Sequence, residues 1–421
     1  MLMTHRSILI ISFDFPPYQS SSGVLRIVSF ARAFRARGWS VSVLTANRSG
    51  GAGSNPENEQ LIPDGCRVVR TRAFDAARTF AIAGKYPGPL EIPDRYSSWI
   101  PSAFWGGIRH LRRFPATHIL SSYPIASSHV IGWLLAAYSG LPWVADFRDP
   151  MLLAGHPETA ARRRAHSWVE RKTIKNCRVA VFTNDAARDA YVEKYPGKDG
   201  RALCVVENGY DEIVFDKAET LAASTRYRAA DDTLNLLHSG TIYPDHRNPV
   251  ALFTALASLQ RKGAFARWRI KLKLRATGYE EQYRTLVAQE FPQLSEIIEF
   301  APPIDYISSV AEILTCDASL ILQGGTCNDQ VPAKMYECVR ARRPVLALVD
   351  PGGETARLLT LMGITKQASM TDPIAIEGLI SSFIEARRQL SLDGFLPSID
   401  VRSLARQNRG RELVETVEAC G

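Results

Sequence analysis

Short apolar, β-branched runs alternate with longer stretches of helical periodicity along almost the whole chain, and no other feature limits the fold as strongly. This alternation is typical of repeated βαβ units, in which a helix connects two parallel strands. In the first half, the pattern predicts strands near 8–13, 41–45, 67–70, 118–121, 143–146, 180–182 and 204–206. It restarts after residue 234, where strands are predicted near 235–239, 270–276, 297–300, 318–322 and 344–348. We therefore expect an α/β protein with two parallel sheets.

A chain of 421 residues is longer than a single hydrophobic core usually supports, so two domains are expected. The predicted domains are residues 1–210 and residues 211–395, and the polar, irregular stretch 207–232 is predicted to link them. The last helical stretch, within 396–421, is expected to pack back on the N-terminal domain. Hydrophobic residues make up 46% of the chain and charged residues 22%, which excludes a generally disordered protein.

The net charge of +8 is unevenly distributed. The first 206 residues contain 27 Lys and Arg against 15 Asp and Glu, a net charge of +12, whereas the remainder carries −4. We expect the basic half to face an anionic partner. The segment 105–114 mixes aromatic and basic residues, and two interpretations of it stay open. It is either a solvated helix face or a contact with the headgroups of acidic lipids.

The location of the protein is suggested by its apolar runs and its cysteines. No apolar run approaches the roughly 18 to 20 residues that a membrane-spanning helix needs. The apolar start at 8–13 is too short for the core of a secretory signal and is better interpreted as a strand. The seven cysteines are odd in number, scattered and without a C-x-x-C pair, which indicates reduced thiols. We expect a cytoplasmic protein that is peripheral on the inner face of the membrane if its basic half binds lipid.

Three common motifs are missing from the sequence. There is no G-x-x-x-x-G-K-[ST] phosphate loop and no G-x-G-x-x-G fingerprint, which argues against a nucleoside triphosphatase and an ordinary dinucleotide enzyme. No Asp-x-Asp pair is present to hold a divalent metal on a diphosphate. A nucleotide diphosphate would be neutralised by basic side chains and helix N-termini instead, so we expect no metal and no cofactor. Nucleic acid is not expected as a partner.

The loop after the first predicted strand is one candidate for ligand binding. It runs from Asp14 to Gly23 and precedes an Arg-rich amphipathic helix. Small residues and a glycine in front of a helix allow backbone N–H groups to approach an anion or a sugar hydroxyl closely. The simpler alternative is an ordinary turn between a strand and a helix.

The most informative stretch of the second half is the one between Asp329 and Val349. Pro332 suits a first helical turn, so Asp329 and the loop 324–326 are predicted to lie at a helix N-terminus. Lys334 and Glu337 are three residues apart and share a helix face. A cation, a carboxylate and free backbone N–H groups in one segment suit a diphosphate together with ribose hydroxyls. The alternative is an i,i+3 ion pair on the surface.

These segments resemble, in order, those of the family 4 group of retaining glycosyltransferases. The resemblance rests on the Phe-Pro-Pro loop and on the segments 37–45, 207–211, 238–243 and 331–349. It implies the GT-B architecture of two Rossmann-like domains whose parallel sheets face each other across a cleft. It also implies transfer of a sugar from a nucleotide-sugar donor to a saccharide or lipid-linked acceptor with retention of the anomeric configuration, in the assembly of bacterial surface polysaccharide or glycolipid.

The resemblance implies roles for several residues of the C-terminal half. Family members carry two glutamates eight positions apart at the donor site, and Glu337 matches the second, which holds the nucleotide ribose. The first position, beside the transferred sugar, is occupied here by Asp329. An Arg and a Lys usually bind the donor diphosphate, and Arg247 and Lys334 are the candidates here. The remaining residues expected to bind the donor are Gly23, Gly240, Gly325 and Thr326.

The N-terminal domain of the family commonly has a His-Asp pair after a strand near the sugar. In this chain the segment is Asp146-Phe-Arg148-Asp149, with Arg148 where the His would stand. Asp146 and Arg148 are predicted to be catalytic, and Asp149 and Tyr18 to lie on the acceptor side. The alternative for Asp149 is the capping of a helix together with an Asp–Arg pair.

Two other functions stay open on the same architecture. One is a nucleotide-sugar epimerase, which needs no acceptor. The other is a non-catalytic subunit that binds a nucleotide sugar, because the residues at positions 148 and 329 differ from those usual in the family.

Overall fold

The computed structural model describes residues 6–18, 22–48, 56–79, 91–152, 159–197, 202–224, 233–265 and 268–420. The chain forms two compact units. The first, here called the N-terminal domain, comprises Met1–Asn208 and Arg406–Gly421. The second, the C-terminal domain, comprises Gly209–Ala405. The last helix thus belongs to the N-terminal domain although the C-terminal domain precedes it in the sequence.

The N-terminal domain is built on a seven-stranded sheet in the order β3-β2-β1-β4-β5-β6-β7, and all neighbouring strands are parallel. The strands are β1 (Ser7–Ile11), β2 (Ser40–Arg48), β3 (Arg67–Ala73), β4 (His118–Ser122), β5 (Trp143–Asp146), β6 (Val179–Phe182) and β7 (Leu203–Val205). The helices are α1 (Ser22–Ala36), α2 (Ala76–Thr79), α3 (Trp99–Arg113), α4 (Ala126–Ser139), α5 (Ala160–Asn176), α6 (Asp185–Lys194) and α14 (Arg406–Glu418), with a 3₁₀ helix η1 (Pro56–Leu61).

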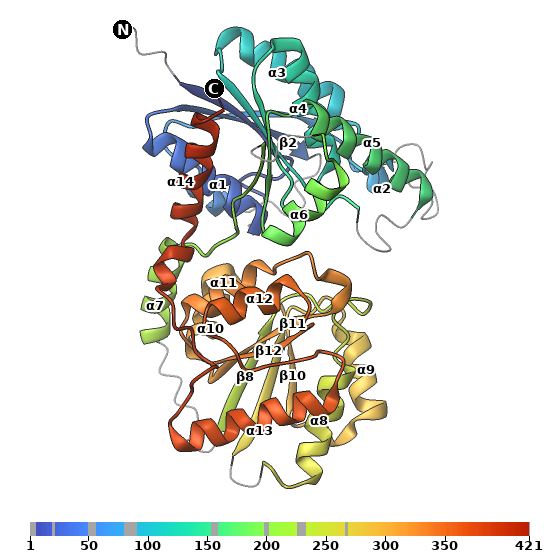
Figure 1. Ribbon diagram of the computed structural model, residues 1–421, viewed down its shortest axis with the longest axis vertical. Helices are drawn as coiled ribbons and strands as arrows, with labels where there is room; N and C mark the ends of the chain where they lie inside the picture. The colour runs from blue at the N-terminus through green and yellow to red at the C-terminus, as the bar shows by residue number, and fades with distance from the viewer. Residues whose placement is uncertain are drawn as a thin grey trace. The chain divides into compact units, whose positions relative to one another are not determined.

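Both faces of this sheet are covered by helices, because successive side chains of a strand point to opposite faces. On β1, Ile8 and Ile10 pack with apolar residues of α1 and α14. Leu9 and Ile11 pack with apolar residues of α3, α4 and α5 on the other face. The two helical layers are visible on the two sides of the sheet in Figure 1.

The C-terminal domain is built on a six-stranded parallel sheet in the order β10-β9-β8-β11-β12-β13. The strands are β8 (Thr233–Ser239), β9 (Arg269–Arg275), β10 (Ile298–Ala301), β11 (Ala318–Gln323), β12 (Val345–Val349) and β13 (Gln367–Ala368). The helices are α7 (Glu212–Ser224), α8 (Val250–Arg261), α9 (Glu280–Glu290), α10 (Tyr306–Thr315), α11 (Ala333–Arg340), α12 (Glu354–Leu361) and α13 (Pro373–Gln389). Three 3₁₀ helices complete it: η4 (Pro292–Leu294), η5 (Gly325–Cys327) and η6 (Val401–Leu404).

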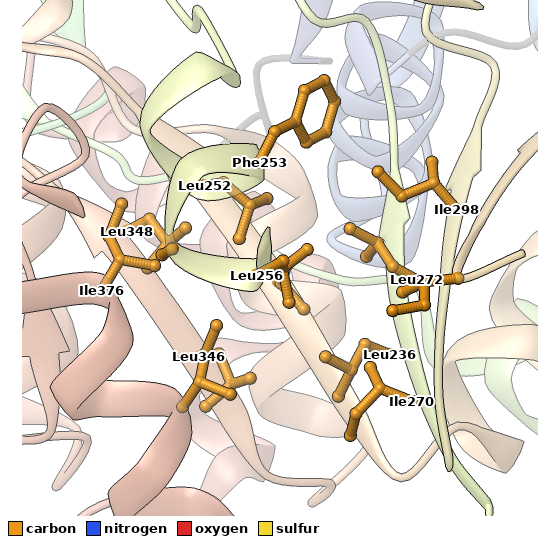
Figure 2. Packing of buried hydrophobic residues seen from close by; sticks show 14 of the residues in the cluster. Leu236, Leu252, Phe253, Leu256, Ile270, Leu272, Ile298, Leu346, Leu348 and Ile376 are labelled. Carbon is orange, nitrogen blue, oxygen red and sulfur yellow. The ribbon is translucent and has the colours of Figure 1, made fainter. Parts of the chain in front are cut away.

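Two apolar clusters hold this domain together. One lies between the sheet and α8, α9 and α13, and Figure 2 shows Leu252 and Leu256 of α8 packed against strand residues such as Leu236, Ile270 and Leu272. The other lies between the opposite face and α7, α10, α11 and α12. The arrangement places the loops that follow β8 and β11 at one edge of the sheet.

Both sheets have the same strand order, counted from the first strand of each domain. In each, the order reverses between the first strand and the fourth, at the β1–β4 pair and the β8–β11 pair. Open parallel sheets bind ligands outside the carboxyl ends of the strands at such a switch point. The fold therefore places one candidate ligand site in each domain.

Every strand predicted from the sequence overlaps one of β1 to β12, in the predicted order. The prediction of an irregular linker at 207–232 is wrong in part, because α7 occupies Glu212–Ser224. This helix buries only Val214, Phe215 and Ala218, and it packs against α10. So short an apolar stripe does not stand out in a polar segment. Among the described residues, no helix has both the length and the apolar character needed to cross a membrane.

Candidate active site

Lys334 lies at the switch point of the C-terminal domain. It is in the first turn of α11, which follows β11. Its Nζ donates hydrogen bonds to Ser239 Oγ at 3.1 Å and to Ser309 Oγ at 3.0 Å. Ser239 is the last residue of β8, the neighbouring strand. The ammonium group is thus held near the carboxyl ends of the two central strands by two neutral hydroxyls, and the carboxylate of Glu337 lies 3.7 Å from it.

Glu337, one turn further along α11, is buried, with 2% of its surface exposed. Its Oε1 accepts a hydrogen bond from Tyr306 OH at 2.6 Å. Its Oε2 lies 3.7 Å from Lys334 Nζ and has no hydrogen-bond partner among the described residues. Buried polar atoms normally have a partner, since leaving one unpaired costs about 1–3 kcal/mol. The i,i+3 ion pair of the alternative interpretation is present, but its carboxylate is buried rather than on the surface, and Oε2 has no hydrogen-bond partner among the described residues.

Arg247 lies in the turn between β8 and α8, beside the same site. Its Nη1 donates to the carbonyl oxygen of Thr241 at 3.1 Å, and its Nε donates to Gln323 Oε1 at 3.2 Å. Burial lowers the pKa of the guanidinium, which still keeps its proton because an arginine is not deprotonated in proteins. Gln323 is the last residue of β11, so Arg247 bridges the loops that follow the two central strands.

These two loops are in direct contact. The backbone N–H of Gly324 donates to the carbonyl oxygen of His246 at 3.1 Å, and a Cβ at Gly324 would lie 2.3 Å from that oxygen. Only glycine allows so close an approach. His246 Nδ1 and Thr326 Oγ1 are 2.9 Å apart and share a hydrogen bond. The site is therefore built on a fixed pair of loops.

The other residues predicted for the C-terminal site lie around this centre. Gly240 follows β8 with a φ of +148°. Gly325 and Thr326 are the first two residues of η5 and are exposed. Asp329 is exposed in the segment between η5 and α11, near the start of the helix. The structure thus gathers all of the C-terminal candidates within the loops after β8 and β11 and the first turns of α11.

The switch point of the N-terminal domain is arranged differently. Asp146, the last residue of β5, is fully buried and accepts two hydrogen bonds from Arg26 of α1, at 2.9 Å and 3.2 Å. It also accepts one from Ser122 Oγ at 2.8 Å. Arg26 donates in addition to the backbone oxygens of Val206 and Glu207. Asp146 is thereby tied into a buried network that joins the helix to the ends of three strands.

Arg148 is held two residues further on. It has a φ of +53°, a conformation that costs a non-glycine residue of order 1–3 kcal/mol and that clusters at functional sites. Its Nη1 donates to the carbonyl oxygen of Tyr123 at 3.2 Å, and a Cβ at Gly23 would lie 2.2 Å from that nitrogen. A side chain at position 23 would therefore displace the guanidinium from the start of α1. Burial lowers the pKa of Arg148, whereas nearby Asp149 and Asp146 raise it.

Asp149 and Tyr18 complete the predicted N-terminal set. Burial raises the pKa of Asp149, and the charge of Arg148 opposes that shift. The proposed capping role of Asp149 is excluded, because Thr159 caps the helix that follows, α5. Tyr18 is buried and its hydroxyl lies 3.5 Å from Asn47 Oδ1.

Four residues at the two sites were not predicted from the sequence. Ser239, Tyr306 and Ser309 position Lys334 and Glu337, and they come from β8 and α10, far from α11 in the sequence. Polar residues of this kind are common, and no spacing links them. Arg26 could have been noticed in the sequence, because it interrupts the apolar run from Val24 to Val28. The structure shows that this part of α1 is buried.

Residues 24–209 match the family model described as a glycosyl transferase 4-like domain. All but the last of the matched residues lie within the N-terminal domain. This match confirms the resemblance found in the sequence. A curated relative, "Probable glycosyltransferase WbjE" of Pseudomonas aeruginosa, is 32% identical over 110 residues, which are 26% of this chain. The match spans about a quarter, 26%, of that relative's length.

Several solved structures are similar over both domains. HepE of Anabaena in complex with UDP and glucose is 15% identical, with a TM-score of 0.67 over 99% of this chain and 100% of its own. Sucrose-phosphate synthase of Thermosynechococcus elongatus is 15% identical, with a TM-score of 0.61 over 99% and 96%. UDP-GlcNAc 2-epimerase of Methanocaldococcus jannaschii is 9% identical, with a TM-score of 0.60 over 98% and 99%. Together with the two parallel sheets, these similarities confirm the predicted GT-B fold class of a glycosyl transferase 4-like domain followed by a second Rossmann-like domain.

Proposed function

We propose that this chain is a glycosyltransferase that moves a sugar from a nucleotide-sugar donor to a saccharide or lipid-linked acceptor. One observation carries the proposal: Glu337 is buried with a free oxygen beside the ammonium of Lys334, at the switch point of the C-terminal sheet. A carboxylate next to a cation suits a ligand that has both hydroxyls and phosphates. The glycosyl transferase 4-like domain in the same chain supports this assignment.

The donor is bound by the C-terminal domain in this proposal. Arg247 and Lys334 neutralise the diphosphate, together with backbone N–H groups around Gly325 and Thr326. Glu337 accepts hydrogen bonds from the ribose hydroxyls, and Gly240 leaves room for the chain to approach the donor. No metal ion is needed in this scheme, because fixed cations and helix N–H groups supply the positive charge.

The reaction breaks the bond between the sugar carbon and the diphosphate oxygen, and it forms a bond from that carbon to an acceptor hydroxyl oxygen. Negative charge grows on the diphosphate while the sugar becomes oxocarbenium-like, so preorganised cations at the diphosphate lower the barrier. We propose retention, with the hydroxyl attacking from the face that the diphosphate leaves and passing its proton to a diphosphate oxygen. Asp329 is proposed to lie beside the transferred sugar.

The N-terminal domain is proposed to contribute the acceptor side. Arg148 is a cation held in a strained conformation at the carboxyl ends of the strands, and we assign to it an anionic group of a substrate. Asp146, Asp149 and Tyr18 are assigned to the ordering of this side, Asp146 through its bond to Arg26. Gly23 belongs to the same group through its contact with the Arg148 guanidinium.

A role in the assembly of surface polysaccharide or glycolipid, at the cytoplasmic face of the membrane, fits the lipid-linked acceptor. The positive charge of the first 206 residues supports this placement, since the inner leaflet is negatively charged. No role with nucleic acid is proposed.

An epimerase is the second candidate, because a UDP-GlcNAc 2-epimerase has a similar fold over almost the whole chain. Product analysis separates the two functions. A panel of nucleotide sugars is first screened by thermal shift, since a true donor raises the melting temperature by mass action. The stabilising donor is then incubated with and without saccharide acceptors. Transfer that depends on the acceptor supports the proposal, whereas an isomerised donor formed without acceptor overturns it.

A further inference from the structure

Three helices form one layer of the N-terminal domain: α3, α4 and α5 lie side by side, with α4 in the middle (Figure 1). They contain nine Lys and Arg and a single acidic residue, Glu170. Glu170 is buried and is bound by Tyr191, Lys194 and Tyr195. The outer face of this layer therefore carries cations and no exposed carboxylate of its own. Of the nine cations, Arg162 has a buried Nε, and the other eight are exposed or partly exposed: Arg109, Arg112, Arg113, Arg163, Arg164, Arg171, Lys172 and Lys175.

The cations are not spread evenly over the layer. All of them belong to α3 and α5, whereas α4 has no Asp, Glu, Lys or Arg. Aromatic side chains occupy the middle and its margins. Tyr138 of α4 is 48% exposed, Trp105 of α3 is 58% exposed and Trp168 of α5 is 41% exposed. The first seven residues of α4 are buried, so the face is a short uncharged, aromatic patch at the C-terminal half of α4 with a cationic helix along each side.

Contacts at both margins join the cations to the aromatic rings. On the α3 side, Arg112 Nη2 donates to Tyr138 OH at 2.8 Å. On the α5 side, Lys172 Nζ lies 5.4 Å from the ring centroid of Trp133 and 5.9 Å from that of Trp168. The rings of Trp133 and Trp168 are themselves 5.7 Å apart. The rings and the cations are therefore presented together as one surface, here called the α3–α5 face.

We propose that the α3–α5 face docks on a membrane that contains anionic phospholipid. Tryptophan and tyrosine rings are suited to the boundary between headgroups and acyl chains, and Lys and Arg near an anionic membrane surface are attracted to it. Long basic side chains on both margins reach the headgroups while their stems stay against the apolar surface. The inference rests on the proposed function for its use, which is to bring the enzyme to a lipid-linked acceptor.

The uncharged middle helix favours a lipid surface over a nucleic acid. Affinity for a nucleic acid comes mainly from cations placed along its phosphates. On the α3–α5 face, the strip between the two rows of cations is aromatic and aliphatic and has no charged residue of its own, so a polyanion crossing it would meet there only the cations that reach it from the margins, Arg112 and Lys172. A membrane instead buries that strip and pairs the rows with headgroups.

The test is flotation of the full-length protein with vesicles at low salt. One set is made of phosphatidylcholine alone and the other of equal parts phosphatidylcholine and phosphatidylglycerol. The double variant Arg112→Glu with Lys175→Glu reverses one charge on each margin, and Arg261→Glu with Arg388→Glu reverses two exposed charges in the C-terminal domain as a matched control. We expect the wild type and the control to float with the anionic vesicles only, and the margin variant to partition at least about tenfold more weakly.

Tryptophan fluorescence gives an independent readout on the unmodified protein. Anionic vesicles are expected to shift its emission to shorter wavelength, and Trp105→Ser to reduce that shift. Equal partition of the wild type on both vesicle types overturns the inference. An equal loss of vesicle binding in the margin variant and in the control also overturns it. Binding to a single-stranded oligonucleotide without binding to vesicles also overturns it.

Donor binding separates this inference from the proposed function. The margin variant is expected to keep the thermal shift produced by the stabilising nucleotide sugar and to keep transfer to a soluble acceptor. Membrane binding without any transfer would contradict the proposed function alone, and transfer without membrane binding would contradict the docking inference alone.

Discussion

The two domains share one strand order, and yet their switch points hold charge in opposite ways. In the N-terminal domain, Asp146 forms a buried ion pair with Arg26. Asp146 also accepts a hydrogen bond from Ser122, and Arg26 also donates to the backbone oxygen of Glu207. In the C-terminal domain, Lys334 is bound by two hydroxyls and lies 3.7 Å from Glu337, whose Oε2 has no hydrogen-bond partner among the described residues. The position in the fold therefore does not decide which charged residues serve a ligand. The decision depends on whether their hydrogen-bonding capacity is already used within the domain.

The largest effect that follows from this comparison is on stability. Asp146→Ala leaves Arg26 buried without its carboxylate, which is expected to cost about 3–5 kcal/mol in the free energy of unfolding. Urea unfolding followed by circular dichroism measures the change. Asp189→Ala removes an exposed carboxylate of the same domain that pairs with Arg188, and it is expected to cost less than about 1 kcal/mol. An Asp146→Ala protein as stable as the Asp189→Ala control would show that Asp146 is not the structural anchor described here.

The next effect is on catalysis at the other switch point. Lys334→Ala removes a fixed cation from the proposed diphosphate site and is expected to lower the transfer rate on the order of 100-fold. Lys334 donates to Ser239 and Ser309 and forms an ion pair with the buried Glu337 at 3.7 Å, so urea unfolding is measured as well to separate a loss of stability from a loss of rate. Steady-state kinetics with the stabilising donor provide the measurement. Lys366→Ala, at an exposed position of the same domain, is the matched control and should retain the full rate. An unchanged transfer rate in Lys334→Ala would show that Lys334 does not bind the diphosphate.

Glu337 is expected to act on donor affinity with a smaller effect. Glu337→Gln keeps the shape of the side chain and a carbonyl oxygen for Tyr306, but it removes the charge. A hydrogen bond to a charged group is typically stronger by about 1 kcal/mol than one between neutral groups, so nucleotide affinity should fall about fivefold to tenfold. Titration calorimetry with the nucleoside diphosphate measures it. Unchanged affinity in Glu337→Gln would contradict the ribose contact, and Tyr306→Phe should show a smaller loss because it affects only the orientation of the carboxylate.

The smallest expected effect is on the pH dependence of the free energy of unfolding. Burial lowers the pKa of His238, at the end of β8, to about 4, so the folded state favours the neutral ring. The unfolded chain binds a proton near pH 6.5, and stability is therefore lost as the pH falls from about 6.5 toward 4, by about 1 kcal/mol per pH unit. His238→Asn keeps a donor for the carbonyl oxygen of Leu320 and is expected to weaken this dependence. Urea unfolding curves at pH 7.0 and 5.5 measure the change in the free energy of unfolding. An equal change in the variant and the wild type would contradict the role of His238.

Sequence patterns predicted the two sheets because each strand is a local apolar run that needs no partner to be recognised. The same holds for the stretch around Lys334 and Glu337, where a proline, a cation and a carboxylate follow one another at helical spacing. The sequence could not predict α7, whose apolar stripe is only three residues long and gains its stability from α10. Helical stability of this kind comes from tertiary packing rather than from local propensity.

By itself, the sequence determined that this protein has two parallel α/β domains and which short segments end their strands. Only the tertiary structure decided which charges in those segments are available. Asp146 and Glu337 both lie in segments singled out from the sequence, but one meets Arg26 from a helix 120 residues away and the other meets a single hydroxyl from Tyr306. Pairing between distant residues depends on how helices pack on the sheet, and no local pattern encodes it.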